Sequence, residues 1–360
     1  MFSAAMMRET TMLWKRPRYN QDVYAWDLLE KGERNAFLGL VAEKKRGAYL
    51  ALDELTKHVI IAGATGGGKT VAGQIIVEEA LLRGVSVVAV DPTGQWTGFL
   101  HAMTDTQTRR LYTRFDLPLS APRQFPTMMA PLTAENLPRI EECFTPGTIR
   151  VLLAGTVDTP TFDALLSRFI DQFFHASLPE SKELRLLLVF DEIHRVLPRY
   201  GGTGAGFVAL ERAVREFRKW GIGVILISQV LEDFIGAIRG NIGTQIQMRT
   251  AYDEDLSKLE TKYGKEITLS VVRAEVGTGM LQNAAYNVGN PFFIRFRPPL
   301  HSFEGLEKKE LDEYLSLAAQ LERWARTIHE PRTIPLAQRA LAKGEFAIVK
   351  SYLEETERKR

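Results

Sequence analysis

Gly63-Ala-Thr-Gly-Gly-Gly-Lys-Thr70 is the stretch that decides the fold, because an apolar run precedes it and a segment with helical patterning follows it. Its glycines allow the backbone to wrap a triphosphate with N–H groups, and the positive end of the following helix points at the same phosphates. Lys69 supplies a charge for the β- and γ-phosphates, and the Thr70 hydroxyl supplies a ligand for Mg²⁺. A chance glycine-rich turn would need neither that pair nor those flanking elements. The predicted nucleotide-binding residues are Gly63, Ala64, Thr65, Gly66, Gly67, Gly68, Lys69, Thr70 and Val71.

Composition limits the class of protein. The 360 residues are 45% hydrophobic and 25% charged, which is ordinary for a soluble globular chain with one large domain. The formal net charge is only +2, so any contact with nucleic acid must come from local clusters. A single cysteine, Cys143, excludes an intramolecular disulfide and favours a reducing compartment. With no signal-peptide core and no apolar run of membrane-spanning length, we expect a cytoplasmic protein.

Apolar runs alternate with helical patterns along the centre of the chain. We expect strands at 58–62, 85–90, 149–154, 184–190, 223–227 and 244–249, and helices at 69–82, 161–175, 207–220 and 254–263. Uninterrupted β-branched and leucine runs separated by helices are typical of a parallel sheet that is covered on both faces. The sequence therefore predicts an α/β fold with a mostly parallel central sheet.

The remaining segments are expected to be accessory. Residues 37–42 and 48–52 predict a small hairpin, and 279–298 predict a second hairpin that closes the domain. Residues 99–148 contain six prolines and suit an irregular insertion over the sheet edge, or a lid, better than a core element. A charged helical tail ends the chain. We divide the chain into an N-terminal segment, a central α/β domain and a C-terminal tail, at 1–56, 57–300 and 301–360.

Polar residues follow three of the expected strands. Asp191 ends an apolar strand and is the predicted magnesium carboxylate, acting behind the direct ligands or through a water. Glu192 is the predicted general base that positions the attacking water. Such a pair can also cap a helix. Gln229 ends another strand, where its amide could contact the γ-phosphate or the water, or simply cap the strand. Asp91 could orient water, yet Asp91-Pro-Thr-Gly94 is also a good turn by itself.

Four blocks of sequence together resemble the HerA/FtsK superfamily of ATP-driven motors. They are His58-Val-Ile-Ile-Ala-Gly-Ala-Thr-Gly-Gly-Gly-Lys-Thr70, Val90-Asp-Pro-Thr-Gly94, Leu187-Leu-Val-Phe-Asp-Glu-Ile-His-Arg195 and Gly223-Val-Ile-Leu-Ile-Ser-Gln229. The resemblance extends over roughly residues 37–299. It is closer to HerA-type proteins and conjugative type IV secretion ATPases than to FtsK itself.

This resemblance implies a RecA-like domain, binding of ATP with Mg²⁺, a homo-hexameric ring, and movement of double-stranded DNA through its pore. In such rings an arginine of one subunit completes the site of the next. Arg249 matches the family's arginine after the segment Asn241 to Thr244, and Arg239 is the second choice. A surface arginine that pairs with a carboxylate is the alternative.

Several points stay open at this stage. HerA proteins carry a small β-barrel before the ATPase domain, and the 62 residues before Gly63 suit a remnant or a shortened barrel, so a nuclease partner is open. Arg195, Arg199 and Gly201–Gly204 form a basic loop that could contact DNA phosphates or lie solvated. A secretion-type ATPase acting on protein partners, without a DNA track, is the alternative function. A nucleotide-binding switch with negligible turnover is a third.

Overall fold

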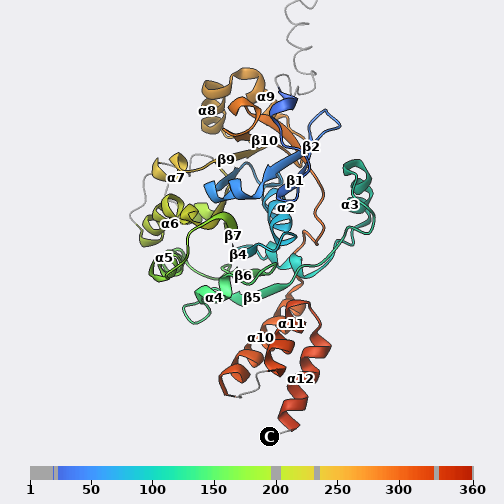
Figure 1. Ribbon diagram of the computed structural model, residues 1–360, viewed down its shortest axis with the longest axis vertical. Helices are drawn as coiled ribbons and strands as arrows, with labels where there is room; N and C mark the ends of the chain where they lie inside the picture. Colours follow the sequence, from blue (N-terminus) through green and yellow to red (C-terminus); the bar gives the residue numbers. More distant parts are fainter. Residues whose placement is uncertain (1–18, 20–22, 196–203, 231–235, 328–331, 359–360) are drawn as a thin grey trace, which may run out of the picture.

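One eleven-stranded sheet organises the chain (Figure 1). The structure, a computed structural model, describes residues 19, 23–195, 204–230, 236–327 and 332–358. The strand order is β2-β1-β11-β10-β9-β3-β8-β7-β4-β6-β5. The strands from β9 to β5 are parallel to one another, and β2, β1, β11 and β10 extend the sheet in antiparallel pairs. The predicted α/β fold with a mostly parallel sheet is therefore confirmed.

The elements have the following bounds. The strands are β1 (Asn35–Val41), β2 (Gly47–Ala51), β3 (Val59–Ala62), β4 (Ser86–Asp91), β5 (Thr127–Pro131), β6 (Ile149–Leu153), β7 (Ser181–Phe190), β8 (Trp220–Ser228), β9 (Thr244–Met248), β10 (Thr278–Asn283) and β11 (Phe292–Phe296). The α-helices are α2 (Lys69–Leu81), α3 (Thr106–Leu111), α4 (Ile140–Cys143), α5 (Thr159–His175), α6 (Ala205–Glu216), α7 (Gly236–Gly240), α8 (Asp253–Tyr263), α9 (Lys265–Val272), α10 (Lys308–Thr327), α11 (Thr333–Ala342) and α12 (Phe346–Arg358). Short 3₁₀ turns are η1 (Ala25–Asp27), η2 (Leu52–Lys57), η3 (Gln95–Leu100), η4 (Tyr112–Phe115), η5 (Ile193–Arg195), η6 (Phe217–Lys219) and η8 (Asn287–Gly289).

Two apolar cores lie on opposite faces of the sheet. Along β3, Val59 and Ile61 belong to the core that packs against α2, whereas Ile60 and Ala62 belong to the core beneath α5 and α6. Successive side chains of a strand point to opposite faces, so a strand buried on both faces must be apolar at every position. This is why the central strands carry uninterrupted apolar runs instead of an alternating pattern.

Two expectations about the flanking segments are wrong. The hairpin of β1 and β2 is not a separate element, because β1 pairs with β11 and so joins the main sheet. Residues 99–148 are not wholly an irregular insertion or a lid either, since they contain β5, which pairs in parallel with β6 and forms the edge strand of the sheet. Prolines are tolerated there because an edge strand leaves one row of backbone groups unpaired, and Pro131 stands at the end of β5.

The segment between α6 and β8 also differs from the expectation. The helix ends at Glu216, a 3₁₀ turn follows, and Trp220 begins β8 instead of ending the helix. Helix α9 follows α8 after Gly264, whose φ of +84° is left-handed and suits glycine. The second hairpin, formed by β10 and β11, and the helical C-terminal tail are both confirmed.

The C-terminal helices cover the edge strand (Figure 1). The buried Tyr314 hydroxyl of α10 accepts a hydrogen bond from the Met129 amide at 3.2 Å and donates one to the Thr127 carbonyl at 3.1 Å. These are outward-facing backbone groups of β5, which would otherwise be open to pairing with another chain. Within the residues that the structure describes, no helix is both long enough and apolar enough to span a membrane.

A buried ion network ties α2 to the antiparallel half of the sheet. The fully buried Arg297, directly after β11, contacts Glu78 at 2.6 Å and Glu79 at 2.8 Å, both on α2. Glu78 also accepts hydrogen bonds from the backbone amides of Leu300 and His301. Burial by itself would raise the pKa of Glu78, but Arg297 and His301 hold it below its ordinary value. Glu79 also pairs with Arg83 at 2.8 Å, so Glu78 is the carboxylate that depends most on Arg297.

We expect Arg297→Ala to lower the free energy of unfolding by about 3–5 kcal/mol, because it removes the buried guanidinium that pairs with both Glu78 and Glu79. Chemical denaturation followed by circular dichroism measures the change. Arg295→Ala is the matched control, since Arg295 lies two residues away and its pair with Glu275 at 2.8 Å is largely exposed. That control should change stability by about 1 kcal/mol or less. Equal losses in the two variants would contradict the assignment.

Candidate functional site

The glycine loop between β3 and α2 is packed tightly against the end of β9. A Cβ atom at Gly63 would lie 2.8 Å from the Cβ atom of Met248, and one at Gly67 would lie 2.9 Å from the Ala64 carbonyl oxygen. The Ala64 amide donates a hydrogen bond of 2.8 Å to the carbonyl of Arg249. Glycine is therefore required by close backbone approach here, in addition to the left-handed φ of +91° at Gly68.

Lys69 begins α2 and points back along the loop. Its Nζ atom donates to the Ala64 carbonyl at 3.4 Å, and only 5% of the residue is exposed. Burial lowers the pKa of Lys69, while the charges of Glu192 and Asp191 act in the opposite direction. The structure therefore brings the lysine of the glycine loop and both predicted carboxylates into one electrostatic site.

Asp191 stands directly after β7 with both carboxylate oxygens occupied. Its Oδ2 atom accepts hydrogen bonds from the Thr70 hydroxyl at 3.1 Å and from the Trp96 indole Nε1 at 2.9 Å. Its Oδ1 atom accepts from the Glu192 amide at 2.9 Å. Burial raises the pKa of Asp191 to about 6, the Trp96 hydrogen bond opposes this, and the charges of Asp91 and Glu192 add to it.

These groups fit a magnesium ion. A hydroxyl oxygen from Thr70 and a carboxylate oxygen from Asp191 are hard ligands of the kind that Mg²⁺ prefers, and it is usually held by one or two protein oxygens together with substrate phosphates. Because the Thr70–Asp191 hydrogen bond already places these oxygens side by side, the two residues could hold Mg²⁺ beside the phosphates.

Glu192 adopts an unusual backbone conformation. Its φ is +47°, in the left-handed region that non-glycine residues rarely occupy, and strained positions of this kind cluster at functional sites. The Nδ1 atom of His194 lies 3.1 Å from its Oε2 atom. Contact with His194 lowers the pKa of Glu192, and the charge of Lys69 and the amide of Gln229 act in the same direction. These contacts therefore favour the ionised carboxylate of Glu192.

Gln229 and Arg249 follow β8 and β9, which flank β3 on its two sides. Gln229 is exposed, and a hydrogen bond from its side-chain amide is one of the contacts that lower the pKa of Glu192. Arg249 is exposed, and its backbone carbonyl accepts a hydrogen bond from the Ala64 amide. The role of Arg249 toward a neighbouring subunit stays a prediction.

Trp96 and His194 were missed from the sequence as site residues. The signal for Trp96 was the turn before it. Asp91 accepts hydrogen bonds from the backbone amides of Thr93 and Gly94 through Oδ1, and from that of Trp96 through Oδ2. Its carboxylate is thus used by the turn, which favours the turn interpretation of Asp91 over a role in orienting water.

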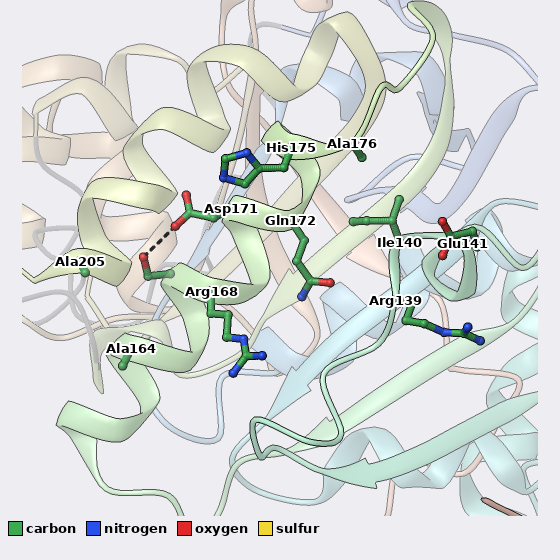
Figure 2. A pocket seen from close by; sticks show the side chains of 11 residues that line it. Arg139, Ile140, Glu141, Ala164, Arg168, Asp171, Gln172, His175, Ala176 and Ala205 are labelled. Carbon is green, nitrogen blue, oxygen red and sulfur yellow. Dashed lines mark hydrogen bonds between the residues drawn. The ribbon is translucent and has the colours of Figure 1, made fainter. Parts of the chain in front are cut away.

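The predicted basic loop after Glu192 falls largely outside the described residues. These end at Arg195 and resume at Gly204, so Arg199 and Gly201–Thr203 are not among them. A separate open groove of about 700 Å³ lies between α4, α5 and the start of α6 (Figure 2). Side chains of both charges surround it, among them Arg139, Arg168 and Asp171. None of the predicted site residues lines this groove.

A comparison with known protein families matches part of the chain. Residues 38–144 match the family model described as helicase HerA-like C-terminal. The resemblance to the HerA/FtsK superfamily of P-loop ATPases is confirmed. The match covers the glycine loop and the Asp91 turn, and it ends before Asp191. No curated protein matches the chain.

Several solved structures are similar to the chain at low identity. The genome packaging NTPase B204 from Sulfolobus turreted icosahedral virus 2, in complex with AMPPCP, is 13% identical, with 66% of this chain and 96% of that chain covered and a TM-score of 0.42. VirB4 of Thermoanaerobacter pseudethanolicus is 13% identical, with 74% and 97% covered and a TM-score of 0.48. The bacterial conjugative coupling protein TrwBΔN70 is 14% identical, with 78% and 93% covered and a TM-score of 0.48.

The raised pKa of Asp191 predicts how stability depends on pH. A carboxyl whose folded-state pKa exceeds its unfolded value loses stability as the pH rises through the folded value, here about 6. In chelator, without nucleotide, we expect the free energy of unfolding of the wild type to fall relative to that of Asp191→Asn, by on the order of 1 kcal/mol between pH 5 and 7.5. Urea denaturation across this range measures it. Parallel pH profiles would show that Asp191 does not titrate in this way.

Proposed function

We propose that the chain is a Mg²⁺-dependent ATPase that works in a homo-hexameric ring and moves double-stranded DNA. The observation that supports this most is the meeting of four side chains, namely Lys69, Thr70, Asp191 and Glu192. They lie beyond the carboxyl ends of β3 and β7, which are parallel and are separated in the sheet by β8. In open α/β sheets this edge is where ligands bind. The resemblance to the HerA/FtsK superfamily supports a motor over a metabolic enzyme. Residues 57–300 would form the motor domain, working in the cytoplasm.

Each residue has a distinct role in the proposed hydrolysis. Amides of Gly63–Thr70 cradle the phosphates, and Lys69 holds the β- and γ-phosphates by charge. Bound Mg²⁺ would neutralise charge that develops on the phosphates, with Thr70 and Asp191 holding it. Glu192 accepts the proton of the attacking water. The side-chain amide of Gln229 donates a hydrogen bond to that water or to the γ-phosphate. Arg249 would complete the site of the adjacent subunit.

A phosphate-release assay with and without duplex DNA tests the function. A DNA motor should hydrolyse ATP faster on duplex, with a strong decline as salt rises, because its grip is on DNA phosphates. ATP turnover that no DNA stimulates would favour the secretion-type ATPase. Absence of turnover under all conditions would favour a nucleotide-binding switch, and both results would overturn the proposal.

Glu192→Gln should retain ATP binding and lower hydrolysis by about 10²-fold or more, the scale of losing a catalytic base. The control is Glu183→Gln, near the amino end of β7, where the side chain is 73% exposed and far from the carboxyl end that Glu192 follows. Its hydrolysis should equal that of the wild type. Undiminished hydrolysis in Glu192→Gln would remove this residue from the mechanism.

Arg249→Ala and Lys69→Ala should each lose activity alone, and their mixture should regain part of it if Arg249 acts across a subunit boundary. A mixed ring contains some sites in which an intact Lys69 faces an intact Arg249, so the phosphate-release rate rises above that of both parents. Arg239→Ala, mixed in the same way, tests the second candidate. If the Arg249→Ala mixture shows no rescue, Arg249 acts within its own subunit or only structurally.

A further inference from the structure

The turn after β4 places the indole of Trp96 next to Asp191, the carboxylate that is proposed to hold magnesium. Asp91 accepts hydrogen bonds from three backbone amides of this turn, and the last of them, at 2.9 Å, belongs to Trp96. A buried carboxylate bound in this way fixes where the Trp96 backbone lies. The turn Asp91-Pro-Thr-Gly-Gln-Trp96 therefore fixes the position of the Trp96 side chain. The mechanism proposed above gives Trp96 no role.

The indole ring is held from several sides. Trp96 is fully buried and lies parallel to Phe99, with ring centroids 5.9 Å apart and an interplanar angle of 2°. Phe99 in turn stacks on His301 at a centroid distance of 3.7 Å. On α2, the position that a Cβ atom of Gly73 would take lies 3.7 Å from the ring. The Nε1–H bond can therefore point in only one direction.

That direction is toward Asp191. Nε1 donates to Oδ2 at 2.9 Å, and the same oxygen accepts from the Thr70 hydroxyl. The Thr70 hydroxyl can bind a cation through its oxygen and still donate its hydrogen to Asp191. The carboxylate thus accepts hydrogen bonds from three donors, namely Thr70, Trp96 and the Glu192 amide. Of these, Trp96 is the side chain that has no direct role toward the cation.

We propose that Trp96 is a positioning residue for magnesium, which fixes the Asp191 carboxylate so that it and Thr70 present their oxygens together. The inference rests on the proposed function. Groups that orient a metal-binding carboxylate through hydrogen bonds typically change metal affinity by about 10–100-fold when removed. Loss of the indole donor would thus weaken the part of the nucleotide affinity that depends on Mg²⁺. The affinity that comes from the contacts of the glycine loop with the phosphates would stay unchanged.

Two variants separate hydrogen bonding from packing. Trp96→Phe keeps an aromatic ring in the stack and deletes the N–H donor. Phe99→Leu disturbs the same stack and keeps the donor. The affinity for a fluorescent non-hydrolysable ATP analogue is measured by direct excitation of the fluorophore, once with Mg²⁺ and once with chelator. Thermal unfolding of each variant confirms that it is folded.

For Trp96→Phe we expect the enhancement of affinity by Mg²⁺ to fall by about 10-fold or more, with the affinity in chelator changed by less than about 2-fold. Phe99→Leu should keep the enhancement. An unchanged enhancement in Trp96→Phe, or an equal loss in both variants, would overturn the role of the N–H donor while the proposed ATPase still stands. A wild type whose affinity does not respond to Mg²⁺ would overturn both.

Discussion

The buried carboxylate of Asp191 is the group on which the arrangement of the site depends. A buried charge is costly unless it is fully hydrogen-bonded, and Asp191 meets this requirement with donors from three segments of the chain. Thr70 comes from the start of α2, Trp96 from the turn after β4, and Glu192 from the residue that follows. Satisfying one acid therefore fixes the helix, the turn and the strand end relative to one another, and it does so at the edge where the phosphates would bind.

The parallel half of the sheet explains why distant residues meet there. Strands β9, β3, β8 and β7 are adjacent and parallel, so their carboxyl ends lie along one edge. The glycine loop follows β3, Gln229 follows β8 and Asp191 follows β7. Backbone contact between Ala64 and the carbonyl of Arg249 closes the other side of the loop. Gly63 and Gly67, which carry no side chain, allow β9 to approach this closely.

Local pattern was enough to predict the central strands and the polar residues at their ends, because burial on both faces imposes apolar runs and Asp191, Glu192 and Gln229 interrupt them. It was not enough where the partner is distant in sequence. The pairing of β1 with β11 and the bond from Trp96 to Asp191 each join residues far apart in the chain. The six prolines of residues 99–148 predict an irregular segment, and its short strand, β5, can be recognised only from its pairing with β6.

Helix α2 is anchored at both ends, and this limits how the site can respond to ATP. Its first turn is tied to Asp191, and its last turn carries Glu78 and Glu79, which Arg297 compensates. Shifting the helix relative to the sheet would separate buried charges, at a cost of about 3–5 kcal/mol. His301 bonds Glu78 and also stacks on Phe99, which lies against Trp96, so the two anchors are joined by packed rings. The lower-energy route for a nucleotide-driven change is therefore through the residues after β7 and β8, where Glu192 holds a strained backbone and Gln229 is exposed.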